Sequence, residues 1–214
     1  MASPAPFDLT VTDELLSSTR AVRRRLDLER PVERQTILDC IALSQQAPTA
    51  SNTQTWHWMV VTDPGKKARL AELYASGSPA LTAAREGLAE GDAQTHRVYD
   101  SAEYLLGVMA DVPALVIPCV QGRVAADAHL CVQASIYGSI FPAVWNFQLA
   151  LRSRGLGSVL TTLHLLQEEQ VAGLLGIPDD VMQVALLPVA YTLGTDFKRA
   201  QRPAPETITH FDKW

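Results

Sequence analysis

Residues 31–65 constrain the fold most, because they set a helix, a polar loop and a strand in direct succession. Apolar side chains recur at helical spacing over residues 33–46, which predicts an amphipathic helix that must end at Pro48. The β-branched run at residues 57–62 predicts a strand, and a helix over residues 66–74 follows the turn that closes it. This alternation predicts a domain in which helices pack against a sheet.

The rest of the chain continues this alternation. Periodicity predicts further helices over residues 99–109, 128–153 and 167–175, and strands over residues 112–120, 158–163 and 184–193. Pro142 predicts a kink or a break in the longest helix, whereas Pro118 and Pro188 predict a bulge or an edge position in their strands. Residues 75–98 show little periodicity, so we expect a variable excursion of short helices or mobile chain near the active site.

Composition favours a single soluble domain over residues 1–214, of which we expect residues 1–10 to be flexible. The formal net charge of -5 argues against a nucleic-acid-binding protein, which needs a broad basic surface. No apolar run approaches the roughly 18 residues of a membrane helix. The three cysteines lie in apolar runs, which is typical of buried thiols in a reducing compartment, so we expect a cytoplasmic protein.

The sequence lacks the motifs of a self-contained catalytic site. Its five histidines show no metal-ligand spacing with each other or with cysteine, so we expect no metal site. Neither a Gly-x-Ser-x-Gly nucleophile motif nor a phosphate-binding loop with its lysine is present, and Gly155-x-Gly157 follows a helix rather than a strand. We therefore expect a bound cofactor to supply the reactive group.

Polar residues that suit a ligand concentrate in three places. Two groups are basic, namely Arg20, Arg23, Arg24 and Arg25 near one end, and Lys198, Arg199 and Arg202 near the other. One interpretation of the arginine run is a solvated helix face. The other is a phosphate clamp, because each charge-assisted hydrogen bond contributes roughly 1.5–3 kcal/mol. The third place is the loop over residues 47–56, which carries more amides and hydroxyls than a connection requires.

A set of ordered sequence blocks resembles the FMN-dependent nitroreductase family. The blocks are TRAVRRRLDLERPV, APTASNTQTW, RSRGLGSVLTTL, LLGIPDD, ALLPVAY and ETITHFDKW, and they extend from about Thr10 to Trp214. The resemblance implies an α+β fold, an α/β/α sandwich around a central mixed sheet. It also implies a homodimer that holds FMN at the subunit interface, with the C-terminal extension packed on the partner subunit.

The resemblance further implies which residues hold the flavin. It implies that Arg20, Ala21 and Arg23 contact the phosphate, the ribityl chain or the pyrimidine edge. It also implies that Arg202 and Arg199 complete the binding of the phosphate. Contacts with the flavin of the other subunit are implied for Pro48, Thr49, Ala50 and Asn52, and Gln54 is implied to support their loop. Positions along the flavin ring near N5 are implied for Leu160, Thr161 and Thr162.

The implied reaction is hydride transfer from NAD(P)H through the flavin to a small electron acceptor such as a nitroaromatic or a quinone. It needs no catalytic side chain. Two alternatives stay open, an FMN-binding or flavin-sequestering protein of the same fold and a specialised flavin-dependent dehydrogenase. We interpret Trp56, Trp58 and Trp145 as core residues rather than as a stack for substrate.

Overall fold

Five strands form one sheet in the computed structural model, which describes residues 6–88 and 92–214. The strands are β1 (Trp56–Val61), β2 (Ala114–Gln121), β3 (Leu156–Ser158), β4 (Val181–Gln183) and β5 (Leu187–Tyr191). Their order is β1-β2-β5-β3, with β4 also beside β2, and these strand pairs run antiparallel. An isolated parallel bridge between Ala21 and Ser158 extends the sheet at β3 and makes it mixed.

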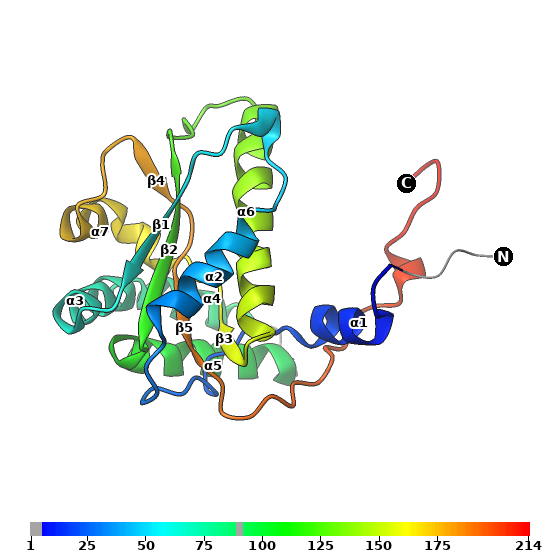
Figure 1. Cartoon of the computed structure of the whole chain (residues 1–214), viewed down its shortest axis with the longest axis horizontal. Helices are drawn as coiled ribbons and strands as arrows, with labels where there is room; N and C mark the ends of the chain where they lie inside the picture. The colour runs from blue at the N-terminus through cyan, green and yellow to red at the C-terminus, as the bar shows by residue number, and fades with distance from the viewer. Residues whose placement is uncertain (1–5, 89–91) are drawn as a thin grey trace.

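Helices cover both faces of this sheet (Figure 1). They are α1 (Leu9–Ser18), α2 (Arg34–Ser44), α3 (Pro64–Ala75), α4 (Ser78–Glu86), α5 (Ala93–Val108), α6 (Leu130–Arg152) and α7 (Glu168–Leu175). Helices α2 and α6 pack together on one face, whereas α3, α5 and α7 contribute to the core on the other face. The predicted α/β/α sandwich is therefore confirmed.

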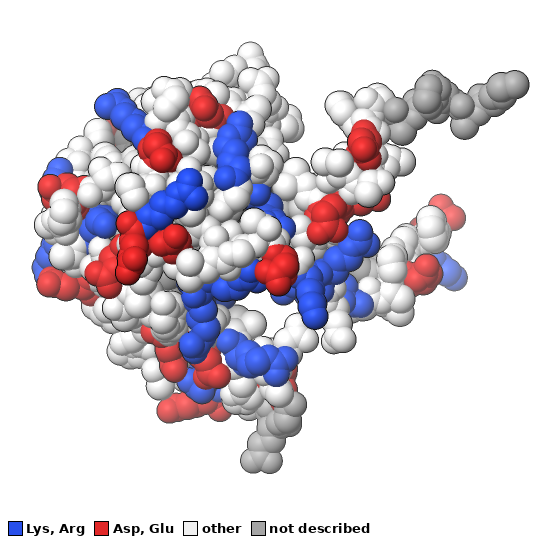
Figure 2. All heavy atoms as spheres, turned by 60° about the horizontal axis from the view of Figure 1, so that its bottom comes forward, with Lys and Arg blue, Asp and Glu red and all other residues white. Residues whose placement is uncertain are grey.

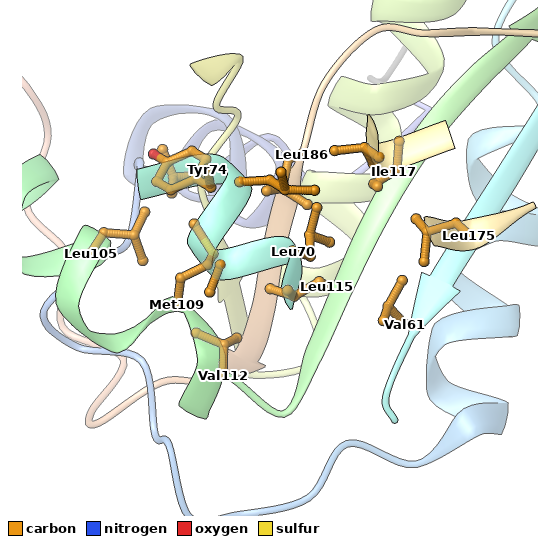
Figure 3. Close-up of a cluster of buried hydrophobic side chains, with 14 of the residues drawn as sticks. Val61, Leu70, Tyr74, Leu105, Met109, Val112, Leu115, Ile117, Leu175 and Leu186 are labelled. Atoms are coloured by element: carbon orange, nitrogen blue, oxygen red, sulfur yellow. The ribbon is translucent and has the colours of Figure 1, made fainter. Parts of the chain in front are cut away.

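Strand β2 divides the core, because successive side chains of a strand point to opposite faces. One face receives Leu115, Ile117 and Cys119, and the other receives Ala114, Val116 and Val120. Figure 3 shows Leu115 and Ile117 in the same cluster as Leu70 and Tyr74 of α3. A fully buried leucine or isoleucine contributes roughly 1.5–3 kcal/mol, so this cluster fixes α3 on the sheet.

Most predicted elements lie near their predicted bounds. The helix predicted over residues 33–46 is α2, the strand over residues 57–62 is β1, and the helix over residues 66–74 is α3. Helix α3 starts earlier than its apolar pattern indicates, because Asp63 caps it. The Asp63 carboxylate accepts a hydrogen bond from the Lys66 backbone N–H at 2.8 Å.

The strand prolines coincide with an irregularity of the sheet. Residues 184–186 join β4 to β5 and lie opposite only Ile117 and Pro118 of β2, so one side carries an extra residue and forms a bulge. Strand β5 is not an edge strand, because it lies between β2 and β3. Pro188 is tolerated there because the pairing with β3 ends at Val189.

The helices differ from prediction at several points. Helix α6 continues through Pro142 as one element, so the predicted break is absent from it. Helix α5 begins at Ala93 because the carboxylate of Asp92 caps it through the Thr95 N–H at 2.9 Å. The excursion predicted over residues 75–98 thus contains α4 and the start of α5, and residues 89–91 lie outside the described residues. Periodicity misses α1, which exposes much of its apolar surface, and the short β4.

The thiols are only partly as predicted. Cys40 and Cys119 are buried, and burial raises the pKa of Cys119 to about 12. Cys131 is exposed, contrary to prediction, because it lies in the first turn of α6, where the side chains face solvent.

In residues 6–88 and 92–214, no helix combines the length and apolarity that crossing a membrane requires, and no cluster of His, Cys, Asp and Glu could hold a metal ion.

The C-terminal segment leaves the body after β5 and extends away from the sheet, on the side of the molecule where α1 lies (Figure 1). Residues 201–214 are all exposed, and the side chain of Trp214 is 99% exposed. Phe211 and Ile208 of this segment and Val11 of α1 are also exposed. Several large apolar side chains exposed near both ends of the chain are more than a monomer needs, and such exposure is typical of an interaction site.

Gly157 of β3 lies where only a glycine fits. An added Cβ would meet Thr192 Cγ2 at 2.7 Å and Val22 Cγ2 at 2.9 Å. Because both neighbours are branched and packed against the sheet, we expect Gly157→Ala to lower the free energy of unfolding by about 1–3 kcal/mol in urea titrations. The control is Gly173→Ala in α7, where an added Cβ meets no atom within 4 Å. Equal stability of the two variants would contradict this packing.

His164 is a fully buried histidine in the 3-10 helix Leu163–Gln167. Neither ring nitrogen has a hydrogen-bond partner among the described residues. Burial lowers the pKa of His164 to about 4, and the nearby carboxylate of Glu168 offsets only part of this effect. The ordinary pKa is about 6.5, so between these two values the unfolded chain binds a proton that the folded chain does not.

This difference predicts a loss of stability in acid. We expect His164 to lower the free energy of unfolding by about 3 kcal/mol as the pH falls from about 7 to 4. His164→Leu should remove that part of the pH dependence, and any constant cost of the substitution cancels between the two pH values. Urea titrations measure it, with His57→Leu at an exposed position as the control. An unchanged pH dependence in His164→Leu would show that the ring is protonated in the folded state.

Candidate functional site

A cleft of about 950 Å³ opens where α5, α6, the end of β3 and the C-terminal segment meet. Its volume is within the range of small-molecule sites, roughly 300–1,000 Å³. Residues from four parts of the chain line it, within the segments 19–23, 94–101, 145–160 and 199–202. The fold therefore brings both basic groups of the sequence to one place.

The cleft is strongly basic. Its described lining residues include five arginines and no Asp or Glu, and the arginines are Arg20, Arg23, Arg97, Arg199 and Arg202. Figure 2 shows Lys and Arg side chains gathered around the hollow between the body and the C-terminal segment. In a chain with a formal net charge of -5, this concentration of positive charge marks a site for an anion.

Backbone pairing with β3 positions the first arginines. The Val22 N–H donates to the Ser158 carbonyl at 2.9 Å, next to the bridge between Ala21 and Ser158. The Val22 side chain is only 5% exposed and packs into the core. Because Val22 is held in this way, Arg20 and Arg23 on either side of it reach the cleft.

Arg23 is the most constrained of the five arginines. Its Nη1 donates to Ser101 Oγ of α5 at 3.3 Å, whereas its buried Nε has no partner among the described residues. Burial lowers the pKa of Arg23, and only the nearby Tyr74 opposes this effect. A buried donor without a partner costs about 1–3 kcal/mol. Since that atom is inaccessible from the cleft, a ligand there would meet other atoms of the Arg23 side chain.

The rest of the arginine run holds the chain in place instead of facing the cleft. The Arg25 and Arg152 guanidinium groups lie 4.3 and 4.8 Å from the centre of the Phe197 ring. Arg24 lies over the Tyr104 ring at 5.2 Å. The run is thus neither wholly a solvated face nor wholly a clamp. Arg20 and Arg23 line the cleft, whereas Arg24 and Arg25 contact aromatic rings of the body.

The C-terminal arginines reach the cleft because the chain before them is anchored. Phe197 lies against the two guanidinium groups named above, and Arg20 Nη1 donates to the Lys198 carbonyl at 2.9 Å. These contacts fix the segment that leads into Arg199 and Arg202, both of which are exposed. One arginine of the cleft therefore positions two others.

The residues after β3 divide into one that lines the cleft and two that do not. Leu160 lines it, and its side chain is 37% exposed. Thr161 and Thr162 follow directly but are not among the lining residues. The Thr161 N–H and hydroxyl both donate to the Leu186 carbonyl, at 3.0 and 2.9 Å. The backbone N–H of Thr161 is therefore already used within the chain.

The polar loop over residues 47–56 lies apart from the cleft of its own chain. The Ala50 N–H donates to Ser139 Oγ of α6 at 3.0 Å, and Gln54 Nε2 donates to Asn52 Oδ1 at 3.2 Å. Ser51 and Asn52 have left-handed φ values of 54° and 55°, which non-glycine residues seldom adopt. Such strained backbone clusters at ligand sites. Pro48, Thr49, Ala50, Asn52 and Gln54 are thus held as a unit outside the cleft.

Sequence patterns miss part of the lining. Gln94, Arg97, Val98 and Ser101 form one face of α5, with the spacing i, i+3, i+4, i+7. The spacing is helical, but the mixed polarity hides it from a hydrophobic pattern. The interpretation of Trp145 as a core residue is wrong, because this side chain is 42% exposed and lines the cleft. Trp56 and Trp58 do pack against the core.

A known protein family matches the sequence of this chain. A sequence profile described as "Nitroreductase family" matches residues 16–191, which is most of the chain. The chain belongs to the nitroreductase family. The matched region includes Arg20, Arg23, the loop, Leu160 and all five strands. Arg199 and Arg202 lie beyond it.

Solved structures of family-like proteins share the fold. A BluB-like flavoprotein from Clostridium difficile 630 is 17% identical to this chain and superposes with a TM-score of 0.70. The match covers 94% of this chain and 99% of that chain. The FMN-dependent nitroreductase NfnB from Mycobacterium smegmatis, in complex with NADPH, is 19% identical with a TM-score of 0.68, covering 96% of this chain and 100% of that chain. An oxidised iodotyrosine deiodinase bound to FMN and 3-iodo-L-tyrosine is 20% identical with a TM-score of 0.69. That match covers 94% of this chain and 99% of the deiodinase chain.

Proposed function

We propose that this member of the nitroreductase family binds FMN in the cleft and transfers hydride from NAD(P)H to a small electron acceptor such as a nitroaromatic or a quinone. One observation carries the proposal. The cleft gathers five arginines without a lining carboxylate, and one of them, Arg23, keeps a buried Nε without a partner among the described residues. The structurally similar NfnB, which is FMN-dependent and in complex with NADPH, supports the choice of cofactor and donor.

The residues of the cleft fit the parts of FMN. Arg20, Arg199 and Arg202 offer charged donors for the phosphate, since they lie together at the C-terminal segment. Ala21 offers a small surface beside the ribityl chain, and the Arg23 guanidinium offers positive charge to the pyrimidine edge. A cation at that edge stabilises negative charge on the reduced ring. When bound, the flavin supplies the atom that accepts and returns hydride.

The residues after β3 complete the ring side of the site. Because Thr161 uses its N–H within the chain, the backbone N–H of Leu160 is the better donor to the ring nitrogen that exchanges hydride. Thr162 would support this turn from outside the cleft. No lining side chain is needed as a catalytic acid or base.

We also propose that the site is completed in a homodimer. The loop that carries Pro48, Thr49, Ala50 and Asn52, supported by Gln54, does not line the cleft of its own chain. Its strained conformation and exposed polar side chains suit a contact with the flavin of the partner subunit. The exposed apolar side chains of α1 and the C-terminal segment offer a surface for that partner.

The reaction is tested by an anaerobic spectral titration of the purified protein with NADH and NADPH. We expect bound oxidised flavin that one or both nicotinamides bleach, and reoxidation by a nitroaromatic or a quinone. Flavin that stays oxidised with both donors would overturn the proposed electron input. That outcome would favour a flavin-binding or flavin-sequestering protein, or a dehydrogenase with another donor.

The phosphate grip is tested by the double variant Arg20→Ala, Arg202→Ala. Losing two charge-assisted hydrogen bonds should raise the Kd for FMN by at least about 100-fold and release most of the flavin on gel filtration. The matched control is Arg34→Ala with Arg69→Ala, which removes two exposed arginines of α2 and α3 that do not line the cleft. Full retention of flavin by the first pair would place the phosphate elsewhere.

A further inference from the structure

We propose that the cleft selects an electron acceptor that carries an anionic group, such as a carboxylate, and that Arg97 of α5 binds this group. The inference rests on the proposed function and deepens it, because it names the chemical class of the substrate. It also gives a role to the start of α5, which lies within the excursion that sequence patterns leave without an assignment.

The number of arginines exceeds what the cofactor needs. A phosphate group carries a charge of about -1.5 to -2, which the three positive charges of Arg20, Arg199 and Arg202 already exceed. Arg23 is held separately by Ser101 of α5. Arg97 therefore remains as a cation of the cleft that the cofactor does not require.

No described carboxylate neutralises Arg97. Helix α5 carries two acidic side chains close by in sequence, Asp100 and Glu103, but both form ion pairs with Arg85 of α4. Arg97 lies one helical turn from Ser101 on the cleft-facing side of α5. Its positive charge is thus directed to the cleft, beside the arginine that we assign to the pyrimidine edge.

The apolar part of the lining indicates what the anion is attached to. Trp145, Val98 and Leu160 line the same cleft, and their side chains are 42%, 46% and 37% exposed. An exposed indole offers a large flat surface on which a conjugated ring can stack. Together with Arg97, these residues fit an aromatic or conjugated acceptor that carries a carboxylate.

The proposal is tested by binding to the oxidised, flavin-loaded protein, without turnover. The probes are 4-nitrobenzoate and its uncharged isostere 4-nitrobenzamide, and the readout is the perturbation of the flavin spectrum. We expect the wild type to bind the benzoate at least about tenfold more tightly than the benzamide, and Arg97→Gln to reduce this ratio to about one. Arg69→Gln, an exposed arginine of α3 outside the cleft, should keep the ratio of the wild type.

Two outcomes would overturn the proposal. One is a wild type that binds both probes equally, and the other is an Arg97→Gln variant that keeps the preference for benzoate. Stopped-flow measurements of the two half-reactions separate acceptor from donor. If Arg97→Gln slows flavin reduction by NADPH and leaves the benzoate to benzamide ratio of reoxidation rates unchanged, then Arg97 serves the donor and the proposal fails.

The outcome also separates this proposal from the proposed function. Flavin that no nicotinamide reduces would overturn the electron input, yet the binding ratio would still test the anion preference. In protein that lacks flavin, calorimetric titration with the same two probes reads the ratio. A preference for benzoate that Arg97→Gln abolishes supports the anion site in each case, and equal binding overturns it.

Discussion

The backbone bond between Val22 and Ser158 is the contact on which the site depends. It ties the segment after α1 to β3, and β3 pairs with β5, from which the C-terminal segment continues. Arg20 and Arg23 are placed by this bond, and Arg20 in turn holds the Lys198 carbonyl before Arg199. Gly157 permits the close approach, because any side chain there would collide with Val22. Segments from the two ends of the chain thereby form one cleft.

The positive charge of the cleft favours the binding of an anionic ligand. Like charges that converge repel one another, and the buried Nε of Arg23 has no partner among the described residues. An anionic cofactor would relieve the repulsion between these charges, which is why we assign the cleft to FMN. The loop at Ser51 and Asn52 also has a strained backbone, and its polar side chains are exposed although hydrogen bonds within the chain hold it in place.

The sequence allowed the fold and part of the site to be predicted, for reasons that differ from residue to residue. Helix α2, strand β1 and the two basic groups were predictable, because apolar periodicity and charge are local properties. Trp145 and the α5 face around Arg97 were not, because the side that a residue faces depends on packing with distant segments. The separate roles of Arg23 and Arg25, two residues apart, depend on tertiary contacts in the same way.

Native mass spectrometry of the purified protein tests the central claim most directly, because it reads subunits and bound flavin in one measurement. The claim is that one chain supplies the arginine cleft and its partner supplies the loop over residues 47–56. The predicted result is a dimer that carries two FMN molecules, and that loses flavin when it dissociates into monomers. A monomer that retains one FMN, or a dimer that carries none, would contradict the account.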